Sequence, residues 1–359
     1  MNRTRWSACL LGAFLVATGH AEEWRREAAL AEASSPTAAA EIQRLLSSVP
    51  WSPQQVVADD VERIMGADLP APARERILYE FAFALRDLPP QSHVLPVLDA
   101  LTEYQAAVLV PSEFTRHPVP LYNVAAAAAG TLHAWAAETQ RDLTLAALDR
   151  GNFEHFDRLA GAPLSAPEIQ GLRQAISAIS PAELEITWPA WQTVLEQRPE
   201  AASLAEPLSR AFGDARALET AARFGTSVPL VARADDMLPA DQAVAFWKQL
   251  ASSDLPGAGP SMVRLAEYGE LNAAKTHRVV HALADPQTGA DMALALARGG
   301  AVDVLAAVAL DADQPELARK RAALGLKLEG SDGSRTALKQ LQADPSAAGF
   351  ADEVAKWVD

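Results

Sequence analysis

Cysteine is almost missing from this chain, which has one at Cys9 and none beyond it. A chain without cysteine pairs cannot be held together by disulfide bonds, even in a compartment that allows them. The apolar run near the start is short as well. It extends from Ala8 to Val16, and its length is about half of the roughly 20 residues that a membrane-spanning helix needs. A hydrophobic core must therefore stabilise the fold.

Positive charge is also scarce, since 31 Lys and Arg residues face 46 Asp and Glu residues and leave a net charge of -15. This balance argues against nucleic acid and anionic membrane surfaces as partners. The sequence further lacks the phosphate-binding motif G-x-x-x-x-G-K, the nucleophile elbow G-x-S-x-G, a Ser-x-x-Lys pair and a calcium loop. Nucleotide chemistry and conventional serine hydrolysis are thus not expected.

The first 21 residues have the composition of a secretory signal peptide. Basic Arg3 and Arg5 precede the short apolar run, and the small residues of the segment 17–21 precede Glu22. We expect cleavage after Ala21, which would leave a periplasmic or secreted chain with no cysteine and a net charge of -17 instead of -15.

Apolar residues recur at helical spacing along most of the chain, and the pattern predicts an all-α protein. One such stripe runs through Ile42, Leu45, Leu46 and Val49. Helix starts are marked by a capping residue three positions before Glu, as in Ser180-Pro181-Ala182-Glu183 and Asp313-Gln314-Pro315-Glu316. Strand-like alternation is not found, and the segment from Pro111 to Asn123 reads as an irregular loop.

The second half of the chain repeats itself with a period of 30 or 31 residues. Three similar segments end at Gly269, Gly300 and Gly330, with an earlier copy at Gly225 and a fainter one at Gly151. A helix that ends at glycine, turns and restarts at this interval predicts helical hairpins, each of which buries its apolar side against the next. The fold expected from this pattern is a right-handed α-solenoid.

The last repeats, from Leu317 to Leu326 and from Ala337 to Leu341, carry small alanines where two helices meet. They resemble HEAT (armadillo-type) repeats, and this resemblance covers residues 213–359. The predicted organisation is a signal peptide at 1–21, a less regular helical region at 22–212 and HEAT-like repeats at 213–359. One continuous solenoid over 22–359 fits the sequence as well.

A metal-like spacing occurs once, at His277-Arg278-Val279-Val280-His281. Imidazoles one helical turn apart can share a zinc ion, with Glu270 or Asp285 as a third ligand. The proteases that use such a pair need Glu directly after the first His, where this chain has Arg278. Solvated surface histidines are the alternative interpretation.

Three further groups of residues are candidates for binding. The loop at 111–123 contains Phe114, Arg116, His117 and Tyr122, a mixture that binding loops often use. Trp188 and Trp191 could form an aromatic shelf for a sugar or a peptide side chain, or fill the core. A locally basic patch could attract an acidic partner, or consist of ordinary solvated helix faces. Its members are Arg319, Lys320, Arg321, Lys327, Arg335 and Lys339.

These features predict an exported helical-repeat scaffold that binds another protein, a peptide or an envelope polymer, with no cofactor and no catalysis. The alternative is a periplasmic hydrolase that acts on envelope polysaccharide or peptide, with metal assistance from the two histidines. A structural module of an envelope assembly is the third possibility. Neither nucleic-acid binding nor membrane insertion after signal cleavage is expected, and the oligomeric state stays open.

Overall fold

The computed structural model describes residues 22–49, 54–270, 276–286, 288–347, 349–350, 354 and 356. Most of these residues are helical, as the apolar periodicity predicts. The chain divides into two compact units, unit 1 (Met1–Leu143 and Ala166–Gly171) and unit 2 (Thr144–Ser165 and Leu172–Asp359). The predicted signal peptide at 1–21 lies outside the described residues. No helix of the described part combines the length and apolar character that crossing a bilayer requires.

The division between the two units falls within α7 (Val124–Asp149) and α9 (Ala166–Ala178), and residues 212 and 213 both belong to unit 2. Contacts between helices explain this assignment. Helix α10 (Pro181–Gln197) contacts α8 (Glu154–Gly161), and it also contacts α11 (Ala205–Phe212) and α12 (Arg216–Ala221). The helices on both sides of residue 212 therefore belong to one unit.

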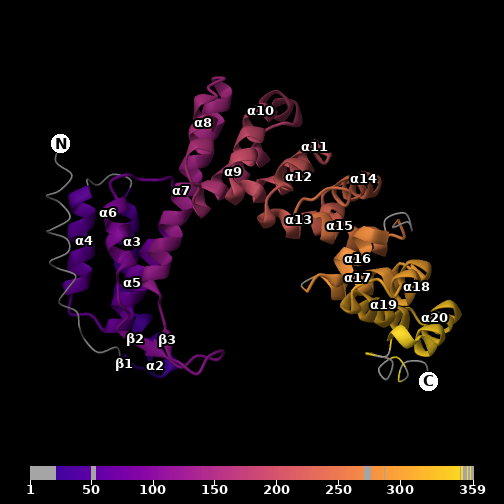
Figure 1. Ribbon diagram of the computed structural model, residues 1–359. Coiled ribbons are helices and arrows are strands. Elements are labelled where there is room, and N and C mark those ends of the chain that lie inside the picture. The colour runs from indigo at the N-terminus through magenta and orange to yellow at the C-terminus, as the bar shows by residue number, and fades with distance from the viewer. Residues whose placement is uncertain are drawn as a thin grey trace. The chain divides into compact units, whose positions relative to one another are not determined.

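Unit 1 is a helical bundle with a small sheet. Its remaining elements are β1 (Glu22–Glu23), α2 (Arg26–Ala33), α3 (Pro36–Ser48), α4 (Gln54–Gly66), α5 (Ala71–Ala84), η1 (Leu85–Asp87), α6 (Leu95–Thr102), β2 (Val108–Val110), β3 (Val119–Pro120) and α7 (Val124–Asp149), as Figure 1 shows. Helix α5 contacts α2, α3 and α4. Trp135 of α7 is buried in this core and donates its Nε1–H to the carbonyl oxygens of Leu85 and Leu88, at 3.0 and 2.9 Å.

The sequence predicts no strands, and on this point it is wrong for three short segments. The strand order is β1-β2-β3, with β1 parallel to β2 (Glu22 opposite Val108) and β2 antiparallel to β3 (Val110 opposite Val119). Segments of two or three residues are too short for an alternating pattern to be recognised. Their apolar side chains cover a small separate core around Ala29.

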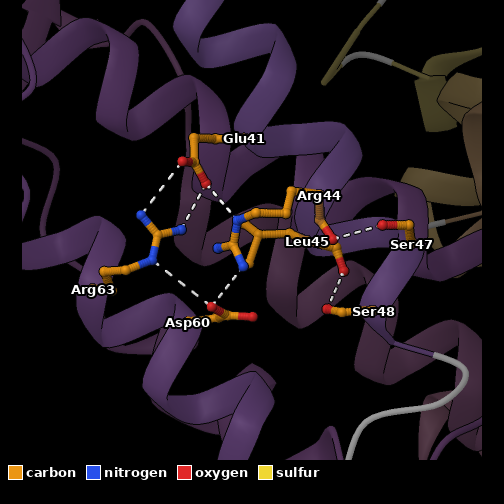
Figure 2. A network of polar contacts seen from close by, with 7 residues as sticks. All are labelled: Glu41, Arg44, Leu45, Ser47, Ser48, Asp60 and Arg63. Carbon is orange, nitrogen blue, oxygen red and sulfur yellow. Dashed lines mark hydrogen bonds and ion pairs between the residues drawn. The ribbon is translucent and has the colours of Figure 1, made fainter.

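A ring of four charged residues joins α3 to α4 (Figure 2). Glu41 accepts hydrogen bonds from Arg63 (2.6 Å) and Arg44 (2.9 Å), and Arg44 also reaches Asp60 (2.7 Å). The hydrogen bond from Arg63 is the main reason why the pKa of Glu41 lies below its ordinary value. The two arginines are both more than 40% exposed, so the ring fixes the helix pair in register more than it stabilises the unit.

Unit 2 contains only helices among its described residues. Besides those given above they are α9 (Ala166–Ala178), which begins in unit 1, η2 (Pro199–Leu204), η3 (Gly225–Ser227), α13 (Val228–Ala232), η4 (Ala234–Asp236), α14 (Ala240–Leu250), α15 (Ala258–Glu267), α16 (Thr276–Ala284), α17 (Gly289–Arg298), α18 (Val302–Leu310), α19 (Glu316–Glu329), α20 (Asp332–Ala343) and η6 (Pro345–Ala347). Helices α15, α17 and α19 contact one another in sequence, and α18 contacts both α19 and α20.

The three clearest repeat glycines end helices as predicted. Gly269, Gly300 and Gly330 follow α15, α17 and α19 and have φ values of 66°, 66° and 73°, a left-handed conformation that suits glycine best. Gly151 also has positive φ. The prediction for Gly225 is wrong, because α12 has already ended at Ala221 and Gly225 begins a short 3₁₀ helix.

Glycine has a second role at Gly299, the residue just after α17. A Cβ atom there would overlap the carbonyl oxygen of Ala266 at the end of α15. The backbone φ is -76°, which any residue adopts, so contact alone requires glycine. Close approach of α15 and α17 depends on this missing side chain.

The substitution Gly299→Ala should therefore lower the free energy of unfolding by about 2 kcal/mol, because the helices must separate to admit the methyl group. Gly333→Ala is the matched control, since a Cβ there would meet its nearest neighbour, Val302, at an ordinary 3.5 Å. It should leave the stability unchanged or raise it by up to about 1 kcal/mol, because alanine favours the helix. Urea unfolding followed by circular dichroism measures both. Equal midpoints for the two variants would contradict this account of the contact.

Candidate functional site

A cavity of about 630 Å³ lies in unit 2. It is bounded by α13, the turn between α14 and α15, the first turns of α15, the end of α16 and the residues before α17. The lining residues are Val228, Ser253, Asp254, Leu255, Pro256, Ala258, Gly259, Pro260, Met262, His281, Ala282, Asp285 and Thr288.

The cavity combines an apolar wall with a polar edge. Leu255 is 36% exposed, while Met262 is buried in the wall. At the edge, Asp285 Oδ1 accepts hydrogen bonds from the backbone N–H of Thr288 (2.8 Å) and from its hydroxyl (3.1 Å), which fixes the entry to α17. A volume in the range of 300 to 1,000 Å³ with a few oriented polar groups is typical of ligand sites.

The predicted metal pair is only partly placed. His281 is exposed at the edge of the cavity, and Val279 and Leu283 are buried on the opposite side of α16, as the helical spacing predicts. The side chain of His277 lies outside the described residues. Of the two suggested third ligands, Glu270 pairs with Lys248 at 2.6 Å, and Asp285 makes the hydrogen bonds to Thr288. The described residues contain no group of three metal-ligating side chains.

The predicted binding loop is the connection of the β2–β3 hairpin in unit 1. Its Phe114 is 95% exposed, and Arg116 and His117 are exposed beside it. Ser112 Oγ accepts hydrogen bonds from the backbone N–H groups of Phe114 (3.2 Å) and Thr115 (3.1 Å), which orders the tip. The fourth predicted residue, Tyr122, lies beyond β3 and packs against Tyr79 instead, with ring centroids 5.6 Å apart.

The predicted tryptophan shelf does not form. Trp191 is fully buried, and its ring meets the edge of Phe156 at 4.9 Å, so it fills the core. Trp188 is half-buried against Phe212 at 5.4 Å, and the guanidinium of Arg216 lies 4.6 Å from the Phe212 ring. Both tryptophans hold helices together, and neither presents a free face beside the other.

The predicted basic patch is broken up by internal contacts. Arg319 is 4% exposed and donates to the carbonyl oxygens of Ala309 and Ser346, so its assignment to a partner surface is wrong. Arg321 donates to the carbonyl oxygens of Leu283 and Pro286. These carbonyl oxygens belong to the ends of helices or turns, where the backbone supplies no hydrogen-bond donor of its own. The sequence does not reveal that an arginine from another helix is needed there.

The remaining members of the predicted patch are two ion-paired residues and two exposed lysines. Lys320 pairs with Glu316 at 2.7 Å and Arg335 with Asp332 at 2.6 Å. Lys327 and Lys339 are exposed. Acidic neighbours thus offset much of the positive charge.

An aromatic groove in unit 1 was missed by the sequence analysis. Tyr79 and Phe83 of α5 and Tyr122 before α7 lie together beside a cavity of about 250 Å³. The available signal was the spacing of Tyr79 and Phe83, one turn apart on α5. The same spacing is equally typical of residues that face the core, because α5 has apolar residues on most of its faces.

Glu75 of α5 is a buried carboxyl group with a strongly shifted pKa. It is fully buried, and its Oε1 accepts hydrogen bonds from the backbone N–H groups of Ala107 (2.5 Å) and Val108 (3.3 Å), which holds the start of β2. Its Oε2 has no hydrogen-bond partner. Burial raises the pKa of Glu75 to about 7, although the two backbone hydrogen bonds act in the opposite direction.

Unit 1 should therefore lose stability as pH rises. A carboxyl group whose folded pKa lies above its unfolded value of 4.5 stabilises the fold most below that value, and the stabilisation disappears as pH passes about 7. The difference between pH 4.5 and pH 8 should be at most about 3 kcal/mol from this group. Glu75→Gln should remove it and unfold at nearly the same urea concentration across this range. An unchanged pH profile in the variant would contradict the assignment.

Comparison of the chain with protein-family models, with curated proteins and with solved structures finds no match.

Proposed function

We propose that this protein is an exported HEAT-like α-solenoid whose unit 2 binds a polypeptide segment in the cavity between α13 and α17, without catalysis. The solenoid part of the proposal is supported by the contacts of α15, α17 and α19 in sequence and by the left-handed glycine after each of them. Hairpins that lean on their neighbours in this way build extended binding surfaces.

The cavity is the observation that carries the proposal. Apolar groups such as Leu255, Pro256 and Met262 suit buried side chains of a ligand, while the exposed imidazole of His281 at the edge offers a hydrogen-bonding group to a peptide backbone. A polypeptide segment offers both kinds of group at short intervals. The acidic character of the chain favours a neutral or basic segment.

A second feature supports a protein partner. Helix α19 exposes Leu317, Leu324 and Leu328, which are 43%, 38% and 55% exposed and lie on one face by their spacing of seven and four residues. Aligned exposed leucines are typical of protein contact surfaces. The outer face of α19 would extend the contact beyond the cavity.

The proposal of export predicts where the mature chain begins. When all 359 residues are produced in a bacterium, the protein recovered from the periplasm should start at Glu22. Cleavage there leaves β1 intact, because Glu22 is its first residue and donates its backbone N–H to Ala107. Intact mass and N-terminal sequencing measure the start. A cytoplasmic protein that keeps residues 1–21 would contradict export.

Filling the cavity should abolish peptide binding. The indole of the variant Ala258→Trp would occupy the cavity from the first turn of α15. Heptapeptides that bind the mature protein are selected from a displayed random library. Those that also bind the variant are then removed. Titration by fluorescence anisotropy should show binding that the variant weakens at least tenfold. The loss follows because the ligand and the indole compete for one volume.

Ala307→Trp is the control, because Ala307 is exposed on α18 and does not line the cavity. It should bind the selected peptides as the unchanged protein does. Selection that enriches no peptide over the Ala258→Trp variant would overturn the proposal. Cleavage of bound peptides, detected by mass spectrometry, would favour a hydrolase instead.

A further inference from the structure

The aromatic groove of unit 1 has two unlike walls. Its lining residues are Tyr79, Phe83, Arg86, Asn123, Ala126, Ala127, Gly130 and Thr131. One wall is the aromatic face of α5, and the other is a strip of small residues on the first two turns of α7. Nothing lies within 4 Å of the point where a Cβ of Gly130 would be, so the space above this strip is open.

The aromatic wall consists of two nearly parallel rings and a third that is tilted against them. The rings of Tyr79 and Phe83 are 5.9 Å apart at an angle of 13°, and the ring of Tyr122 lies 5.6 Å from Tyr79 at 51°. Phe83 is 49% exposed although it belongs to a well-packed helix. Leaving this much apolar surface in water costs free energy that a ligand would recover.

Polar groups lie at the margin of the aromatic wall. Arg86 lies one turn beyond Phe83, is exposed and has no carboxylate partner among the described residues. Asn123 accepts a hydrogen bond from the backbone N–H of Ala126 at 3.0 Å, which leaves its amide nitrogen as a donor. The groove therefore combines a stacking surface with a guanidinium and an amide donor.

We propose that this groove binds one ring of a saccharide chain. The C–H face of the sugar would stack on the exposed ring of Phe83, which Tyr79 supports from its side, and the hydroxyl or carboxylate groups of the sugar would accept hydrogen bonds from Arg86 and Asn123. The volume of about 250 Å³ is slightly smaller than pockets for drug-sized ligands, which suits a single ring. The site is separate from the peptide cavity of unit 2 and does not depend on it.

Other flat or apolar occupants fit less well. A nucleobase would stack equally well, but a nucleotide strand binds chiefly through several cations along its phosphates, and Arg86 is the one cation among the residues that line the groove. An aliphatic side chain of a protein partner would cover Phe83 but would remove water from Arg86 without giving it an acceptor. A saccharide ring satisfies both walls, because it has one apolar face and a polar rim.

The test uses the mature protein and two defined probes, tetra-N-acetylchitotetraose as a neutral saccharide and tetragalacturonate as an anionic one, with binding measured by titration calorimetry and saturation-transfer NMR. Phe83→Ala should weaken every probe that binds by about tenfold, because stacking is lost. Arg86→Gln should weaken tetragalacturonate more than chitotetraose, because only the former brings carboxylates to the guanidinium.

Two further variants keep the result decisive. Gly130→Leu places a side chain in the groove from a position where a Cβ meets nothing within 4 Å. It should abolish binding of both probes without lowering the urea concentration at which the protein unfolds. Phe153→Ala removes a matched aromatic in unit 2, where Phe153 is 44% exposed and packs against Phe156, and it should bind both probes normally.

The proposal is overturned if neither probe binds the unchanged protein, or if Phe153→Ala weakens binding as much as Phe83→Ala does. It is also overturned if a protein partner needs Phe83 while both saccharides fail to bind, which would assign the groove to a side chain of that partner. None of these outcomes bears on the heptapeptides that the Ala258→Trp variant fails to bind, so the two proposals succeed or fail separately.

Discussion

The close approach of helices at small residues is the contact on which this structure depends. Without disulfide bonds, short helices stay in place only through the area that they bury against each other, and that area grows as their axes come closer. At Gly299 nothing larger than hydrogen fits, because a Cβ would overlap the backbone of Ala266, and at Gly325 a Cβ would lie 2.7 Å from the end of the Leu305 side chain. Gly171 has the same function in unit 1, where a Cβ would lie 2.7 Å from Gln140 Cβ. Each unit is thus assembled from contacts between neighbours, and charge adds register more than strength.

The same use of small residues opens the two cavities. Where Ala126, Ala127 and Gly130 face the aromatic side chains of α5, the strip is too shallow to fill the space, and a groove is left. Where Ala258 and Gly259 begin α15, the turn after α14 and the end of α16 enclose a larger volume. A protein that packs tightly through small residues must leave a gap wherever such residues face outward or meet a turn. The cavities are therefore consequences of the packing rule, and their chemistry depends on the few large side chains at their margins.

Local signals predicted local structure well. Ser180 forms the complete capping box with Glu183 that its motif indicates, since every partner lies within four residues. The similar motif at Asp313 fails, because Asp311 accepts hydrogen bonds from Asp313 and Gln314 and the helix begins after Pro315. Gly269, Gly300 and Gly330 were recognisable because a left-handed turn after a helix needs glycine wherever it occurs. The residues before Gly225 match the repeat pattern, but its backbone does not form the same helix end. The neighbouring sequence does not distinguish a glycine that ends a helix from one that does not.

The candidate sites were harder to predict because each is decided by contacts between distant residues. Nothing near Arg319 in the sequence shows that it ends up beneath Ser346, or that Trp191 rather than Trp188 becomes fully buried. The aromatic groove needs residues from α5 and α7, which are adjacent only after folding. On α5 alone, Tyr79 and Phe83 look like part of the core, and exposure is what distinguishes them from Phe81, which is fully buried. A helix that is apolar on most faces has more apolar surface than one bundle can cover, so its uncovered face is where a ligand is best sought.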